Sequence, residues 1–293
     1  MARETAAEPQ TQQRAGRDYT RFIILSGPRT GSHLLAEGLN SSPAITCFGE
    51  VFNFKLAYIM YAVEGYDPSD PDALALQQRD PVGFLNERIY GEYPQAIRAV
   101  GFQYHYGHVY GFPGLFDELA GDTELRILHL KRQNVLRMLV SLKLAKTTGV
   151  FHKREQRRFT AASVARALRN PMRAAGRLGA MLRAPEPSEA PPRVQVAVTL
   201  DELNDYVDAT AASAASLEER FQDHPMLTVL YEDLARDRDV VFAKAQSFLG
   251  IEPAPLHVNL QKQNPQPLRE LVANYDELAA SLRDSPGAWM LDS

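Results

Sequence analysis

Short apolar runs alternate with helical patterns along most of the chain. Runs of strand length occupy 22–25, 98–103, 125–130 and 226–231. The first, third and fourth runs are each followed by apolar residues at helical spacing, around 34–39, 135–144 and 240–249. A continuous apolar run is typical of a strand buried on both faces, and strands that alternate with helices predict a parallel α/β sheet covered by helices.

The clearest helix is predicted over 199–221. Its apolar positions repeat at intervals of four and three residues, which is the spacing of one helix face. Thr199 followed three residues later by Glu202 matches the capping box that opens many helices. We interpret this helix as part of the scaffold.

Composition indicates one large domain. The chain has 293 residues, 45% of them hydrophobic, and its net charge of −4 gives no indication of nucleic-acid binding. The single cysteine, Cys47, excludes an intrachain disulfide and a cysteine-based zinc site. No run reaches the roughly 18 apolar residues of a membrane span. We therefore expect a cytoplasmic protein with a flexible polar tail over 1–20 and one domain over 21–293.

The segment 152–198 differs in composition from the rest of the chain. Between 153 and 183 it carries nine basic residues and one acid, Glu155, and 184–192 has the composition of an extended linker. We expect a basic helical insertion or lid here. Its charge fits a solvated face, a lid that recruits an anionic acceptor, or peripheral contact with an anionic membrane or carrier.

A glycine-containing turn follows the first apolar run. Gly27 and Gly31 would let a ligand approach the backbone closely, Thr30 and Ser32 add hydroxyl donors, and Arg29 adds a fixed charge. Because backbone amides at the start of a helix point toward bound anions, this strand, turn and helix predict a phosphate site.

The turn lacks the lysine of an ATP-binding loop. That loop has four residues between its glycines and then Lys-Ser/Thr, whereas here three residues separate Gly27 from Gly31, and Ser32 and His33 follow. A kinase or ATPase would therefore lack its main phosphate-binding side chain.

Two motifs resemble signatures of the sulfotransferases. ILSGPRTGSHLL at 24–35 is similar to their 5'-phosphosulfate loop, and LHLKRQNVLRMLVSLKLA at 128–145 is similar to their second signature, an arginine at a strand end and a serine on the next helix. The resemblance is to bacterial carbohydrate sulfotransferases of the nodulation-factor type, and it extends to 49–53, 229–234 and 262–278. It implies a P-loop-like, three-layer α/β domain that uses 3'-phosphoadenosine 5'-phosphosulfate without a metal.

The resemblance also implies which residues hold this donor. Arg132 and Ser141 would bind the 3'-phosphate, although they lie one residue further apart than in many members, so Lys131 or Arg137 could share the role. The remaining donor-binding residues would be Arg29, Thr30, Gly31, Ser32 and His33 at the 5'-phosphosulfate, and Lys262 in a C-terminal loop that closes over the nucleotide.

The acceptor hydroxyl needs a group that takes its proton. Glu50 matches the residue proposed as base in similar bacterial enzymes, and its alternative is a solvated or ion-paired loop carboxylate. His105 is the second candidate, because a histidine base serves in many eukaryotic members. His105 and His108 equally fit an aromatic wall, and a zinc site lacks a third clear ligand. We assign catalysis to Glu50, with Arg29 and His105.

These patterns predict a sulfotransferase that moves a sulfuryl group directly, in line, to a hydroxyl of a carbohydrate, glycolipid or other small molecule. Two alternatives belong to other classes: a P-loop kinase that uses ATP, and a non-catalytic nucleotide-binding or membrane-associated scaffold. Binding of ATP with magnesium would favour the first, and binding of anionic liposomes by 153–183 would favour the second.

Overall fold

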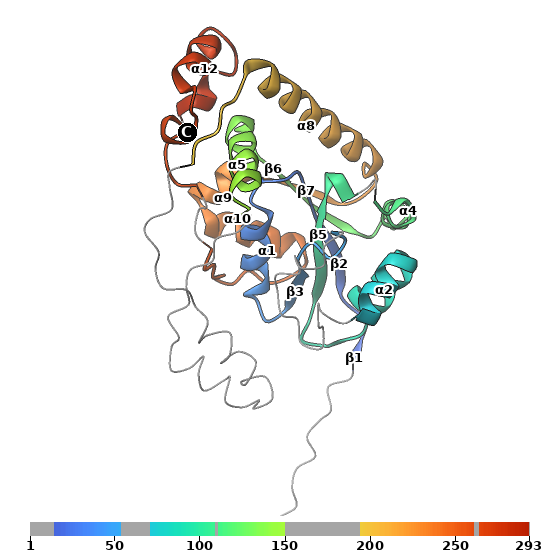
Figure 1. The fold of residues 1–293 in the computed structure, drawn as a ribbon. Coiled ribbons are helices and arrows are strands. Elements are labelled where there is room, and N and C mark those ends of the chain that lie inside the picture. The colour runs from blue at the N-terminus through green and yellow to red at the C-terminus, as the bar shows by residue number, and fades with distance from the viewer. Residues whose placement is uncertain (1–14, 54–70, 109–110, 150–193, 261–263, 293) are drawn as a thin grey trace, which may run out of the picture.

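A five-stranded parallel sheet forms the centre of the protein (Figure 1). The computed structural model describes residues 15–53, 71–108, 111–149, 194–260 and 264–292. In spatial order the strands are β3 (Ile45–Phe48), β5 (Ala99–His105), β2 (Thr20–Ser26), β6 (Arg126–Lys131) and β7 (Met226–Leu230). Every neighbouring pair is parallel. The predicted α/β class with a central parallel sheet is confirmed.

Helices cover both faces of this sheet. Because side chains alternate along a strand, Ile23 and Leu25 of β2 enter one apolar cluster and Phe22 and Ile24 enter the other. The first cluster packs against α2 (Pro71–Arg79), α3 (Pro81–Phe84), the π-helical turn Leu85–Ile89 and α4 (Pro113–Gly121). The second packs against α1 (Ser32–Asn40), α9 (Tyr231–Arg236) and α10 (Arg238–Phe248). Figure 1 shows α1 and α10 on the opposite side of the sheet from α2 and α4, which gives three layers.

A third cluster packs four helices together. These are α5 (Val135–Thr148), α8 (Leu200–Arg220), α11 (Leu268–Leu271) and α12 (Tyr275–Leu282), with a 3-10 turn at Ala288–Asp292 beside them. The helix predicted over 199–221 is α8. Thr199 caps it by accepting from the Glu202 amide at 3.2 Å, but the Glu202 carboxylate pairs with Lys143 Nζ of α5 at 2.6 Å. The capping box is therefore only half formed, because a lysine on the neighbouring helix binds the carboxylate.

Three of the strands that the structure describes were not predicted from the sequence. β3 is only four residues long, and Thr46 and Cys47 interrupt its apolar pattern, yet all four residues are buried against β5. The other two, β1 (Ala15–Gly16) and β4 (Tyr93–Pro94), form a separate antiparallel pair. Strands as short as these carry too few positions for a periodic signal.

Parts of the predicted domain layout lie outside the described residues. These are 1–14 of the tail and most of the insertion, 152–193. Of the predicted tail, Ala15–Gly16 is paired in β1, and at the end of the insertion Val196 forms a bridge with Val272. The insertion remains a prediction. Within the described ranges, no helix is long and apolar enough to cross a membrane.

Candidate active site

The carboxyl ends of the five parallel strands meet at one edge of the sheet, and the predicted site residues follow these ends. The glycine turn follows β2, Glu50 follows β3, His105 ends β5 and Arg132 follows β6. Ligands in open α/β sheets bind at this edge. The parallel order thus gathers residues that are far apart in the sequence.

The glycine turn leads directly into α1. Gly31 precedes the helix with φ +95°, and no side chain among the described residues caps the helix start. Thr30 Oγ1 donates to the Gly27 carbonyl at 2.9 Å, which closes the turn. Arg29 also has a positive φ, +63°, a left-handed conformation that non-glycine residues seldom adopt outside strained functional loops. The start of α1 thus has no side-chain cap within the described residues, and its role as an anion site remains a prediction.

Gly31 allows Tyr231 to approach the turn. A Cβ at position 31 would lie 2.6 Å from Tyr231 Cδ2, closer than any side chain tolerates. The same Tyr231 ring carries the Arg132 guanidinium, whose carbon lies 4.2 Å from the ring centroid. Tyr231 begins α9 directly after β7, so the last strand of the sheet supports both the turn and the arginine.

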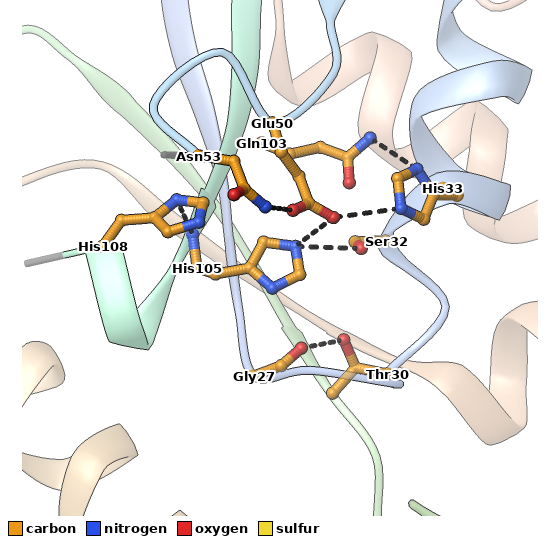
Figure 2. Close-up of polar contacts among 9 residues, drawn as sticks. All are labelled: Gly27, Thr30, Ser32, His33, Glu50, Asn53, Gln103, His105 and His108. Carbon is orange, nitrogen blue, oxygen red and sulfur yellow. Dashed lines mark hydrogen bonds and ion pairs between the residues drawn. The ribbon is translucent and has the colours of Figure 1, made fainter. Parts of the chain in front are cut away.

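Glu50 is the centre of a polar cluster beside the start of α1 (Figure 2). His33 Nε2 lies 3.1 Å and His105 Nε2 lies 3.4 Å from the same carboxylate oxygen, Oε1. Asn53 Nδ2 donates to the other oxygen, Oε2, at 2.8 Å. Gln103 Nε2 lies 3.2 Å from His33 Nδ1, a contact that places the His33 proton on Nε2, facing Glu50. The predicted residues Glu50, His33 and His105 are brought together.

The cluster adjoins the glycine turn through His105. Its Nε2 lies 3.4 Å from Ser32 Oγ as well as 3.4 Å from Glu50 Oε1. The side chains of His105 and Glu50 are only 13% and 11% exposed, so solvent screens their interaction weakly. His108 is held apart from the carboxylate, because its Nδ1 accepts from the His105 backbone amide at 3.3 Å.

Glu50 and His105 both have lowered pKa values, which leave the two side chains in different charge states. Burial by itself raises the pKa of Glu50, but the His33 hydrogen bond, the two imidazoles and Asn53 outweigh it and hold that pKa well below its ordinary value. Burial lowers the pKa of His105, and the Glu50 charge offsets this only in part. At neutral pH we therefore expect a carboxylate next to a neutral imidazole.

Arg132 and Ser141 both form hydrogen bonds with Arg29 of the glycine turn. Arg132 Nη1 donates to the Arg29 carbonyl at 3.2 Å, and Arg29 Nε donates to Ser141 Oγ at 3.0 Å. Asn264 Nδ2 also donates to Ser141 Oγ, at 3.3 Å. The one-residue longer spacing between Arg132 and Ser141 therefore still places both residues at the turn.

The two alternatives to Arg132 have other partners. Lys131 forms an ion pair with Glu218 of α8, and Arg137 Nη1 donates to the Gln266 carbonyl at 2.7 Å. Lys262 lies outside the described residues, so its role remains a prediction. Among the residues that the structure describes, no group of three histidine, cysteine, aspartate or glutamate side chains could hold a metal ion.

Sequence reasoning did not give functional roles to Asn53, Gln103, Tyr231 and Asn264. Asn53 lies three residues after Glu50, and its contact with the carboxylate could have been predicted from this short spacing. Gln103 is a polar residue in an apolar strand, where a buried polar group requires a partner. Tyr231 directly follows a strand, which is a local signal for a site residue in α/β folds. The role of Asn264 depends on long-range packing and has no local signal.

Comparison with known proteins supports the family resemblance. No family model matches the sequence. Nodulation protein H of Rhizobium tropici is 28% identical over 275 residues, which cover 91% of this chain and 91% of that protein. Nodulation protein H of Rhizobium meliloti is 26% identical, with 91% and 93% covered. A solved sulfotransferase from Alicyclobacillus acidocaldarius matches 93% of this chain and 94% of its own length at 17% identity, with a TM-score of 0.45. The resemblance to bacterial proteins of the nodulation-factor type, which the motifs indicated, is thereby confirmed along nine-tenths of the chain.

Proposed function

We propose that this protein transfers a sulfuryl group from 3'-phosphoadenosine 5'-phosphosulfate to a hydroxyl of a glycan, glycolipid or other small molecule. The observation that carries the proposal is the position of His105 Nε2, at 3.4 Å from both Ser32 Oγ of the phosphate-binding turn and Glu50 Oε1. A proton acceptor thus adjoins the place where a phosphosulfate would be held.

The donor fits the polar groups that surround the turn. The uncapped start of α1, Thr30 and Ser32 would hold the 5'-phosphosulfate, while Arg132 and Ser141 would hold the 3'-phosphate. Within the described residues, the buried Arg132 Nε has no hydrogen-bond partner, so it can donate to a phosphate oxygen. This donor has no β- or γ-phosphate, which explains a turn that lacks the lysine of ATP-binding loops.

The proton of the acceptor hydroxyl would pass to His105. A base must be unprotonated and near the reacting group, and the lowered pKa of His105 keeps its imidazole neutral. After Nε2 takes the proton, the Glu50 carboxylate beside it stabilises the imidazolium. This assignment differs from our sequence-based choice of Glu50 as base, because the His33 and Asn53 hydrogen bonds and the neighbouring imidazoles hold the pKa of the carboxylate low. The hydroxyl oxygen then attacks sulfur in line, as the bond to the bridging phosphate oxygen breaks.

Ligand binding tests the donor. We expect 3'-phosphoadenosine 5'-phosphate to raise the Tm, by roughly 2.7 kcal/mol of stabilisation at 100 times its dissociation constant, whereas ATP with magnesium has no comparable effect. Stabilisation by ATP alone would refute the proposal in favour of phosphoryl transfer. Stabilisation by the bisphosphate without turnover on any hydroxyl acceptor would favour a nucleotide-binding scaffold.

Turnover of matched variants tests the proton acceptor. His105→Gln and Glu50→Gln should each lower kcat about 10²- to 10⁴-fold, while nucleotide affinity is nearly unchanged. His257→Gln, at an exposed histidine, is the control. Rates fall in acid as His105 becomes protonated, and Glu50→Gln moves this limb to lower pH, since loss of the carboxylate lowers the His105 pKa. If His105→Gln retained most of its turnover and Glu50→Gln lost it, Glu50 itself would be the base.

A further inference from the structure

Arg29 lies in the phosphate-binding turn, but its side chain contacts the predicted 3'-phosphate site. Its Nε donates to Ser141 Oγ at 3.0 Å. Ser141 belongs to α5, and Asn264 Nδ2 approaches the same hydroxyl at 3.3 Å. Side chains from two distant parts of the chain therefore converge on one serine.

The backbone of Arg29 is fixed from the same direction. Its left-handed φ of +63° is unfavourable for a residue with a Cβ and needs support from the surroundings. Arg132 Nη1 supplies that support through its hydrogen bond to the Arg29 carbonyl at 3.2 Å. Both residues assigned to the 3'-phosphate thus hold Arg29, one by its side chain and one by its carbonyl oxygen.

The charges around Arg29 also favour an anion at this place. Arg29 and Arg132 are close enough to repel each other, and burial and this repulsion lower the pKa of Arg29. The carboxylate of Glu50 offsets the repulsion only in part. A phosphate dianion with three acceptor oxygens would accept hydrogen bonds from two neighbouring guanidinium groups.

We infer that Arg29 recognises the 3'-phosphate of the donor and not its 5'-phosphosulfate. This inference rests on the proposed function and deepens it. The Arg29 side chain would contact the 3'-phosphate. Through this contact the protein would distinguish a 3'-phosphorylated donor from adenosine 5'-phosphate, which lacks that group. The 5'-phosphosulfate would be left to the backbone amides, Thr30 and Ser32.

Calorimetric titration with three nucleotides tests the inference. The probes are 3'-phosphoadenosine 5'-phosphate, adenosine 5'-phosphate, and adenosine 2',5'-bisphosphate, which has the same charge as the first but the phosphate on the neighbouring carbon. Arg29→Gly removes the side chain and keeps the positive φ accessible, and Arg29→Asn is a second variant that tolerates this φ. Arg220→Ala removes one exposed positive charge at the far end of α8 and is the control.

We expect both Arg29 variants to lose at least about tenfold in affinity for the 3'-phosphate nucleotide, since a charge-assisted hydrogen bond is removed. Their affinity for adenosine 5'-phosphate should change less than about threefold, and the control should match the wild type. Equal losses for both nucleotides would place Arg29 at the 5'-phosphosulfate and overturn the inference, as would no loss for either. If the wild-type protein bound none of the three probes, or bound all equally, the proposed function itself would fail.

Discussion

Replacing Gly31 by alanine should damage both stability and nucleotide binding. An added Cβ would lie 2.6 Å from Tyr231 Cδ2 and 3.0 Å from Cε2, so the ring has to move. Overpacking of this kind costs about 1–3 kcal/mol. The left-handed backbone at φ +95° costs alanine about 1–2 kcal/mol more. The sum is a loss of about 2–5 kcal/mol, which for a domain of this size lowers Tm by on the order of 10 °C.

Gly31→Ala should also weaken nucleotide binding, because the Tyr231 ring that it displaces supports Arg132. The Arg132 guanidinium lies over this ring at 4.2 Å, and Arg132 Nη1 holds the Arg29 carbonyl. Displacing the ring disturbs Arg132, whose proposed charge-assisted hydrogen bond to phosphate would be worth about 1.5–3 kcal/mol. We therefore expect the dissociation constant for 3'-phosphoadenosine 5'-phosphate to rise at least about tenfold in Gly31→Ala.

Gly38→Ala is the matched comparison. Its added Cβ would lie 2.0 Å from Phe242 Cζ, a closer contact than at Gly31, but without a positive φ and about two turns further along α1. Both variants should lose stability in urea denaturation, yet only Gly31→Ala should lose affinity in calorimetry at a temperature where both are folded. Wild-type affinity in folded Gly31→Ala would refute the role of the Gly31–Tyr231 contact in nucleotide binding.

Three further predictions concern stability. Burial lowers the pKa of His108 to about 4. Its contribution is therefore complete above the unfolded-state pKa of about 6.5, and up to about 3 kcal/mol is lost as the pH falls toward 4. Urea midpoints between about pH 7 and 4.5 should show this fall, and His108→Gln should flatten it. Thr199→Ala removes the cap of α8 and should cost about 1 kcal/mol, whereas Lys143→Ala, at a part-exposed ion pair, should cost less than about 1 kcal/mol in the same assay. Tyr106→Phe leaves the fully buried His129 Nε2 without its 2.7 Å partner and should cost about 1–3 kcal/mol by urea denaturation. An unchanged midpoint in Tyr106→Phe would mean that water replaces the hydroxyl.

The sequence predicted the parts of the fold and site that depend on local pattern. β2, β5, β6 and β7 are strands of five to seven residues built around recognisable apolar runs, whereas β3 has four residues and two of them are not strongly apolar. The glycine turn was predicted because a strand, a turn and a helix follow one another in sequence.

The contacts between site residues could not be predicted in the same way. Glu50 and His105 were each named from a motif, but their contact depends on the parallel register of β3 with β5, in which Phe48 lies opposite Phe102. The contact of Arg29 with Ser141 depends on how α5 packs beside the turn, and a motif aligned along the chain gives no side-chain direction. Motifs thus identified the residues, and packing determined their partners.

The strand order also has a consequence for folding. β2 lies in the middle of the sheet, with β5 on one side and β6, about a hundred residues further along the chain, on the other. His105 reaches the turn only when β5 is paired, Arg132 only when β6 is paired, and Tyr231 follows β7, the last strand to leave the ribosome. Such long-range pairings form slowly. The proposed nucleotide site therefore cannot form before these strands have paired, and we expect a newly made chain to bind its donor only after the whole sheet has formed.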